Sequence, residues 1–164
     1  MRVTFDQLAH PTAHHATVHT DVFRSGLDDR FVGGLVDFPG RTVQCIMVLS
    51  GNALRIKADS EEMIVGPAIN WGPKSSDTRI KAKAGSNGII MTLGDATLSN
   101  AIGHKPEAAA LRLMSAREFT LGLTAKPNIA QTISTCFDAI FKELDAGQTG
   151  METVIEAQIR IMLV

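Results

Sequence analysis

Four histidines near the N-terminus are the first residues whose chemistry stands out. His10, His14, His15 and His19 lie within the segment HPTAHHATVH, and imidazole is a common metal ligand. His10, His14 and His19 could share one face only in a helix, whereas Pro11 and the residues that follow favour an extended chain. No cysteine or carboxylate lies inside the cluster to complete a metal site. We therefore expect neither a metal nor another cofactor, and we interpret residues 1–17 as an N-terminal arm.

The remaining reactive residues give no catalytic motif. The two cysteines, Cys45 and Cys136, lack the regular spacing of a disulfide scaffold, so free buried thiols are expected. The chain contains no G-x-S-x-G nucleophile motif, no phosphate-binding P-loop and no G-x-G-x-x-G motif. Neither nucleophilic catalysis nor a nucleotide cofactor is supported. We predict that the chain is not a self-sufficient enzyme.

Composition excludes binding by bulk charge. The 164 residues include 16 basic and 17 acidic side chains, with a formal net charge of −1, which gives no field for holding nucleic acid or an anionic membrane. No apolar run approaches the roughly 20 residues that span a bilayer, and the N-terminus lacks the apolar segment of a secretory signal. The expected location is cytoplasmic, with no membrane partner.

Two groups of charged side chains lie on expected strands and have the chemistry of possible sites. Arg79, Lys81 and Lys83 share one face of a strand, where they could bind an anionic ligand or simply face solvent. Glu61 and Glu62 are adjacent and therefore point to opposite faces of a strand, which argues against a pair of catalytic carboxylates.

The elements that would position such residues begin with a series of short strands. Alternating apolar and polar residues, separated by turn residues, predict an antiparallel sandwich or barrel. Ser50, Gly51 and Asn52 indicate a hairpin-type turn. Leu54 and Ile56 alternate with Arg55, so Arg55 is expected on a solvent-facing side. The predicted strands are 18–24, 31–38, 41–50, 54–58, 61–65, 68–71, 77–84, 89–93 and 117–121.

Helical spacing begins after Gly94. Asp95 is interpreted as an N-cap for a short helix that ends at Gly103, and Pro106 opens another short helix over 106–114. Apolar residues recur at three- and four-residue steps over 127–146, which predicts a long amphipathic helix. A second helix over 151–164 completes an antiparallel hairpin. Its apolar pattern continues to Val164, which favours a chain cut within a longer protein over a native C-terminus docked into the core.

Several stretches together resemble the N-terminal domain of arabinose-regulator-type (AraC-family) transcription factors. The family's hairpin around a Leu-Ser-Gly turn resembles IMVLSGNALRIK, and its strand, Gly-Pro break and next strand resemble EEMIVGPAINWGP. The short helix that follows the strands resembles DATLSNAIGH, and the two helices over 126–164 resemble the segment that leads to the DNA-binding half. These motifs are loose, but together they cover most of the chain.

This resemblance implies a mainly β domain with C-terminal helices: a cupin-like double-stranded β-helix (jelly roll) over 18–121, then a helical hairpin for dimerisation over 122–164. It implies an effector-sensing domain for an unknown small molecule and a homodimer, with DNA bound only through a C-terminal helix-turn-helix domain outside this chain. A stand-alone cupin-fold binding protein or a metal-dependent cupin enzyme is the alternative. No histidine lies between Arg41 and Leu93, so the enzyme would need a metal site supplied by the N-terminal histidines folding into the barrel.

The mechanism expected from the resemblance is a change in the arm and helices when an effector binds inside the barrel. Strand residues expected to face inward form the candidate ligand-binding wall: Met47, Ile56, Met63, Trp71, Ile80 and Met91. Apolar residues of the two helices form the candidate dimer interface, with packing of the same stripe on the barrel as the alternative: Ile133, Phe137, Ile140, Phe141, Val154 and Ile161.

Overall fold

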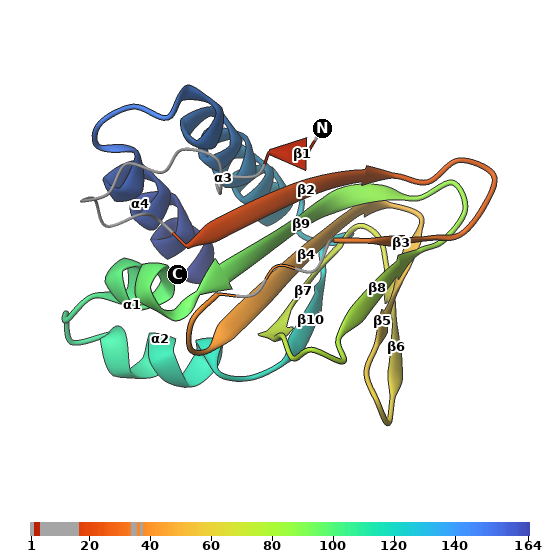
Figure 1. The fold of residues 1–164 in the computed structure, drawn as a ribbon, viewed down its shortest axis with the longest axis horizontal. Helices are drawn as coiled ribbons and strands as arrows, with labels where there is room; N and C mark the ends of the chain where they lie inside the picture. Colours follow the sequence, from red (N-terminus) through yellow and green to blue (C-terminus); the bar gives the residue numbers. More distant parts are fainter. Residues whose placement is uncertain (1, 4–16, 34–35, 37) are drawn as a thin grey trace.

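The computed structural model describes residues 2–3, 17–33, 36 and 38–164. The histidines His10, His14 and His15 and most of the expected arm lie outside these residues. Two antiparallel sheets and four helices make up the described part (Figure 1). One sheet has six strands in the order β1-β2-β9-β4-β7-β10, and the other has four in the order β3-β8-β5-β6. The expectation of a mainly β chain with C-terminal helices is confirmed.

The strands of the six-stranded sheet come from distant parts of the sequence. Their bounds are β1 Arg2–Val3, β2 Val18–Arg24, β4 Thr42–Ser50, β7 Ala68–Pro73, β9 Asn87–Gly94 and β10 Phe119–Gly122. Those of the four-stranded sheet are β3 Arg30–Val32, β5 Asn52–Ile56, β6 Glu61–Val65 and β8 Arg79–Ala82. The predicted strands 18–24 and 61–65 are confirmed with the same bounds, whereas β3 and β8 are shorter than 31–38 and 77–84.

The helices lie on the side of the six-stranded sheet that faces away from the four-stranded sheet (Figure 1). They are α1 Asp95–Ile102, α2 Ala108–Ser115, α3 Pro127–Ala146 and α4 Met151–Leu163. Helix α3 begins at a proline, whose missing N–H is no loss in a first turn, and ends before Gly147 in the left-handed conformation, which suits glycine. Asp95 is the first helical residue of α1 and Gly94 is its N-cap, so the prediction of Asp95 as N-cap is wrong by one position.

Two apolar cores lie on the two faces of the six-stranded sheet. Val43, Cys45 and Met47 of β4 pack with the helices, and Ile46 and Val48 pack between the sheets. Because both faces of β4 are covered, all its residues from Thr42 to Val48 are buried, including the polar Thr42 and Gln44.

The turn at Ser50, Gly51 and Asn52 does not close a hairpin. Strand β4 pairs with β7 and β9, whereas β5 pairs with β6 and β8, so this turn carries the chain from one sheet to the other. Gly51 has φ +75°, and a Cβ there would lie 2.7 Å from the backbone of Ser86, so the turn requires glycine. The prediction of a hairpin is therefore wrong. Turn residues indicate the local backbone conformation, but they do not determine whether the two strands that flank the turn pair with each other.

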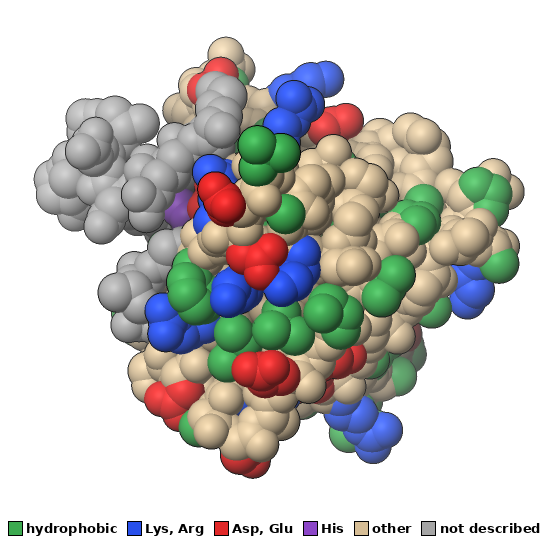
Figure 2. Space-filling view, turned by 90° about the vertical axis from the view of Figure 1, so that its right-hand side faces the viewer, with side chains coloured by type: hydrophobic (Ala, Val, Ile, Leu, Met, Phe, Trp, Pro, Cys, Tyr) green, Lys and Arg blue, Asp and Glu red, His purple; other side chains and the backbone are tan. Residues whose placement is uncertain are grey.

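The surface of the four-stranded sheet side carries both signs of charge. Figure 2 shows Lys and Arg side chains interspersed with Asp and Glu and with hydrophobic groups over this face. On the outer face of β8, Arg79 and Lys81 flank the ring of Phe31, and Lys83 pairs with Asp29. Among the described residues, no helix is both long and apolar enough to cross a bilayer.

Candidate functional site

The six residues predicted to line one wall are divided among three environments. Met47, Trp71 and Met91 are at most 2% exposed and belong to the core beneath the helices. Trp71 and Met91 both lie opposite Cys45 in the strand register, and the Trp71 indole donates a hydrogen bond to the carbonyl of Ser115 at the end of α2 (2.9 Å). These three residues therefore hold the helical layer on the sheet.

The other three predicted wall residues lie on the four-stranded sheet. Ile80 is 1% exposed and packs between the sheets, as expected. Ile56 is half-buried and lies on the face of β5 opposite to the buried Ala53 and Arg55, and Met63 is 47% exposed, so the expectation that these two residues face inward is wrong. On β6 it is Ile64 that enters the core between the sheets; a shift of one residue exchanges the two faces of a strand. Effector contact by these six residues stays a prediction.

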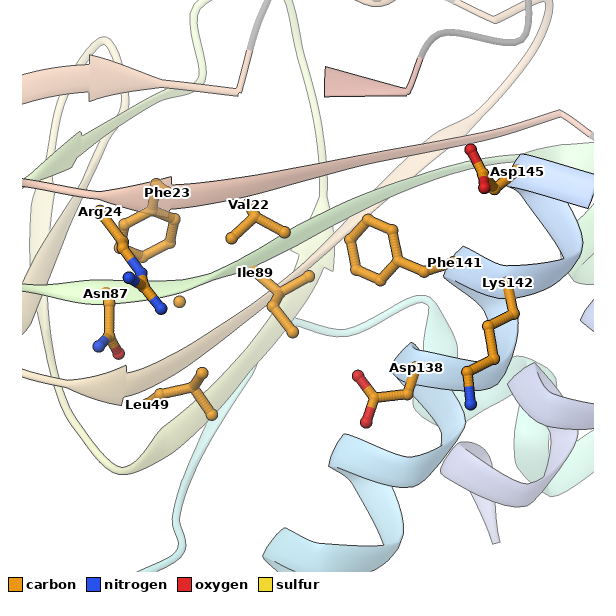
Figure 3. A pocket seen from close by; sticks show the side chains of 11 residues that line it. Val22, Phe23, Arg24, Leu49, Asn87, Ile89, Asp138, Phe141, Lys142 and Asp145 are labelled. Atoms are coloured by element: carbon orange, nitrogen blue, oxygen red, sulfur yellow. The ribbon is translucent and has the colours of Figure 1, made fainter. Parts of the chain in front are cut away.

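A cavity lies between the six-stranded sheet and α3, and we call it the sheet–helix cavity. Its volume is about 460 Å³, within the range of small-molecule sites. Figure 3 shows the ring of Phe141 directed from α3 toward Val22 and Ile89 of the sheet. The lining residues come from β2, β4, β9 and α3: Val22, Phe23, Arg24, Leu49, Asn87, Gly88, Ile89, Asp138, Phe141, Lys142 and Asp145.

The sheet–helix cavity has an apolar floor and polar groups around it. Leu49 is 42% exposed although it is apolar, so this end of the sheet is not covered by the helices. The side-chain oxygen of Asn87 is buried without a hydrogen-bond partner among the described residues. An unpaired buried acceptor costs free energy, and a ligand that donates a hydrogen bond there would recover it. The cavity can therefore hold an apolar molecule with a polar group.

A second cavity, of about 710 Å³, opens between the two sheets; we call it the between-sheet cavity. Its lining comes from β2, β3, the segment that links β7 to β8, and β8 itself. Phe23 and Ile80, each 1% exposed, are its most deeply buried lining residues. The full set is Asp21, Val22, Phe23, Arg30, Phe31, Val32, Gly33, Lys74, Ser76, Thr78, Arg79 and Ile80.

A buried arginine crosses the space between the sheets at another edge. Arg55 is 1% exposed; its guanidinium donates to the Asn70 side-chain oxygen (2.5 Å) and to the Pro73 carbonyl (2.7 Å). Its Nε lies 3.9 Å from Oε1 of Glu118. Burial lowers the pKa of Arg55, and the charges of Glu118 and Glu62 oppose that shift. The expectation that Arg55 faces solvent is wrong. Asn70 and Pro73 of β7 accept hydrogen bonds from its guanidinium, and the carboxylate of Glu118, next to β10, offsets its charge.

Glu118 extends this network to the surface. Burial acts to raise its pKa, but the hydrogen bond from Lys57 and the charges of Arg55 and Lys57 outweigh burial and hold the pKa below its usual value. Thr120, on β10, donates to Glu62 (2.6 Å) and accepts from Asn70 (2.9 Å). The network joins β5 and β6 to β7 and β10, so its role is to hold the two sheets together.

The described cysteines, Cys45 and Cys136, and the described histidines, His19 and His104, belong to no group of side chains that could hold a metal. Cys45 and Cys136 are free and buried, which confirms the expectation, and burial raises the pKa of both thiols, which disfavours the nucleophilic thiolate. His19 is buried on β2. Within the described ranges, no three His, Cys, Asp or Glu side chains gather as a metal site would need.

The six residues predicted to form the dimer interface also lie in different environments. Ile133, Phe137 and Ile140 are 5%, 0% and 0% exposed and belong to the core between α3 and the sheet. Phe141 is half-buried and lines the sheet–helix cavity. Val154 and Ile161 of α4 are 37% and 50% exposed. Only these last two present an open apolar surface. Val22, Leu49 and Ile89 were not among the predicted site residues, because nothing in the local sequence distinguishes a cavity wall from a packed core.

Comparisons with known proteins bear on the fold. No protein-family model matches the sequence, and a search of curated proteins finds no match. The structure of apo ToxT K231A from Vibrio cholerae strain SCE256 superposes with a TM-score of 0.52 at 8% identity, over 91% of this chain and 55% of that one. Unsaturated fatty acid bound wild-type ToxT from the same strain gives 0.47 at 9% identity, over 92% and 53%. The AraC-like transcriptional activator CuxR gives 0.45 at 12% identity, over 89% and 48%.

The likeness to apo ToxT is one of fold, since only 8% of aligned residues are identical. This chain spans little more than half of the ToxT chain. The expected fold is supported to this extent: over 91% of its length, this chain has a fold similar to that of part of the ToxT chain.

Proposed function

We propose that this chain is the effector-sensing and dimerisation domain of an AraC-type transcription regulator, built as a cupin-like jelly roll over 18–121 and a helical hairpin over 122–164. The DNA-binding half would lie outside this chain. One observation carries the proposal: the sheet–helix cavity has the sheet as one wall and α3 as the other. A molecule bound there contacts the element that connects the sensor to the C-terminal helix.

The cavity residues indicate how binding would be coupled to the helices. Val22 and Ile89 belong to the sheet, whereas Asp138 and Phe141 belong to α3. An effector that packs between Phe141 and the sheet gains contacts only at one separation of these elements. A ligand shifts a conformational equilibrium only by its difference in affinity for the two states. An effector would therefore select one position of α3, and α4 would follow because the two helices pack together.

Arg160 links the last helix to the rest of the domain. Its guanidinium donates to the carbonyl of Ile102 (2.8 Å) and to the carboxylate of Glu107 (2.5 Å), so α4 is tied to the end of α1 and to the segment before α2. Asn100 of α1 also donates to Glu156 of α4 (2.9 Å). A movement of α4 away from α1 would have to break these bonds, so their loss would mark a second arrangement of the hairpin.

Leu49→Trp tests the cavity, and the uncharged apolar dye Nile red serves as the probe. Leu49 is 42% exposed, so the larger ring can occupy the cavity without entering the core. We expect saturable dye fluorescence with the unmodified chain and about a tenfold weaker affinity for Leu49→Trp, because lost apolar burial of this size is worth roughly 1.4 kcal/mol. Hydrogen exchange in α3 should slow on dye binding.

Leu113→Trp is the matched control, since Leu113 is 60% exposed on α2 and lies outside the cavity. Equal dye affinity in the two variants would place the apolar site elsewhere, with the predicted wall around Met47 and Met91 as the next position to test. Dye binding with no change in α3 exchange would favour a stand-alone binding protein over a sensor. A coding sequence without a DNA-binding domain would contradict the regulator assignment.

The proposed homodimer uses the open face of α4. Val154, Ala157 and Ile161 follow one another at steps of three and four residues and are all exposed, so they form one apolar stripe opposite the buried Ile155 and Ile159. We expect Ile161→Glu to raise the dimer dissociation constant by about tenfold or more, because a carboxylate would be desolvated at the interface. Sedimentation equilibrium measures this. Leu113→Glu is the control, and a dimer equally stable in both variants would exclude the α4 stripe.

A further inference from the structure

We propose that β6 binds an extended segment of a partner protein, which adds to the four-stranded sheet as a further strand. The segment that fits has two apolar residues and one basic residue at alternate positions. Strand β6 (Glu61–Val65) forms one edge of this sheet, because it pairs with β5 and, in the described part of the chain, with no other strand (Figure 1). The sheet–helix cavity lies against the other sheet, so this interaction surface is separate from the proposed effector site.

The backbone of β6 offers hydrogen-bonding groups at this edge. In an antiparallel pair, residues that bond the neighbouring strand alternate with residues whose N–H and C=O point away from it. Gly66 donates to the carbonyl of Gly51, and Lys57 donates to that of Ser60, both at 2.8 Å and at opposite ends of the β5–β6 pair. With the register between these bonds, they fix which residues point away: Glu61, Met63 and Val65. An extended chain beside β6 would bond this row of groups.

Strand β6 is the longest edge strand of the two sheets as described. It has five residues, whereas β1, β3 and β10 have two, three and four. Proteins commonly protect an exposed edge with a lysine, a proline or a β-bulge. Strand β6 contains neither lysine nor proline, and its register with β5 runs without a bulge. Of the described edges, β6 is therefore the one most open to an added strand.

The side chains beside the edge determine which residues the added strand must carry. Met63 is 47% exposed and Val65 is 63% exposed, and both lie on the outer face of the sheet. Met63 is opposite the half-buried Leu54 of β5, and Figure 2 shows further hydrophobic side chains across this face. Directly opposite residues on one face of a sheet contact each other. Apolar residues opposite Met63 and Val65 would therefore remove both side chains from water.

Glu61 determines the charge of the third position. It is exposed and lies on the same face as Met63 and Val65. In the part of the chain that the structure describes, Glu61 forms no ion pair, and its opposite residue on β5 is the uncharged Ile56. Opposite charges stabilise a cross-strand pair and like charges destabilise it. A basic residue is therefore favoured opposite Glu61, and an acidic one is disfavoured.

The peptide TVTVTKT, labelled with fluorescein at its N-terminus, tests the proposal. In antiparallel pairing its valines lie opposite Val65 and Met63 and its lysine lies opposite Glu61. Fluorescence anisotropy should show saturable binding to the chain. N-methylation of the central valine should weaken binding at least tenfold, because it removes the N–H that would bond the Met63 carbonyl. N-methylation of the next threonine is the matched control: that N–H points away from β6, so the Kd should change by no more than about twofold.

Glu61→Lys tests the charge. It should weaken binding of TVTVTKT about fivefold and strengthen binding of TVTVTET by a similar factor, since cross-strand charge pairs contribute up to about 1 kcal/mol. Glu61 is exposed, so the change should not prevent folding. Asp77→Lys makes the same change of charge at an exposed position between β7 and β8 and should leave both affinities unchanged.

Several results would overturn the proposal. Equal losses from the two N-methylations would mean that the peptide docks without adding a strand, and equal effects of Glu61→Lys and Asp77→Lys would mean that only overall charge matters. No binding at millimolar peptide would also exclude the site. Sedimentation of the Ile161→Glu variant, without the α4 interface, tests for a second copy: a dimer that the peptide dissociates would mean that this chain itself occupies the edge.

Discussion

Replacing Phe137 by alanine is expected to lower the free energy of unfolding by about 3–5 kcal/mol, the usual cost of deleting a buried aromatic side chain. Phe137 is 0% exposed and belongs to the core shared by α3 and the six-stranded sheet. The loss includes the transfer of the ring to water and the cavity that remains, because neighbours such as Ile140 and Met47 are held by their own elements and can close it only in part.

Urea unfolding followed by circular dichroism measures this loss. Phe31→Ala is the matched control: the same substitution at a residue that is 52% exposed should cost about 1 kcal/mol or less. The Phe137→Ala loss should be the same at different protein concentrations, since the ring is buried within one chain. A loss that grows on dilution would instead indicate that Phe137 lies in the dimer interface, as the sequence-based prediction proposed.

Replacing Arg55 by alanine is expected to cost about 3–5 kcal/mol, as found when one partner of a buried ion pair is removed. The change leaves the Asn70 side-chain oxygen and the Pro73 carbonyl without the donors they have now. It also leaves Glu118 with Lys57 as its remaining cationic contact. The two sheets would lose their buried polar connection at this edge and keep the links from Lys57 to Glu118 and from Thr120 to Glu62 nearer the surface, so we expect cooperative unfolding to begin here.

Arg41→Ala is the control for Arg55→Ala, because it removes an ion pair with Asp95 in which both side chains are about half exposed (3.7 Å). Surface pairs of this kind contribute about 0–1 kcal/mol. A double-mutant cycle of Arg55→Ala with Glu118→Ala would separate the pairing from the loss of side-chain volume. If Arg55→Ala costs no more than Arg41→Ala, the network does not hold the sheets together.

Elements with local signals could be predicted well from the sequence. The long helix 127–146 agrees at both ends, because Pro127 starts it and Gly147 ends it, and each acts within one turn. The strands 18–24 and 61–65 also agree. Where bounds differ, as in β3 and β8, pairing with neighbours decides how far a strand extends, and those neighbours are distant in sequence.

The direction of side chains was less predictable. Arg55 is buried because Glu118 lies 63 positions further along the chain, within reach of its guanidinium, and no local pattern contains that information. Met63 was expected to face inward and faces solvent instead. In β4 both faces are apolar, so the sequence does not distinguish Met47, which packs under the helices, from Ile46, which packs between the sheets.

The sequence by itself determined the class of this protein: a β-rich domain followed by two amphipathic helices, without a catalytic motif, because periodicity, turn residues and helix ends depend on near neighbours. Only the tertiary structure decided where the cavities lie and which apolar residues remain open. Val22 and Phe141 are 119 positions apart and line one cavity. A binding site is formed by the residues that packing leaves uncovered, and packing depends on contacts between distant segments.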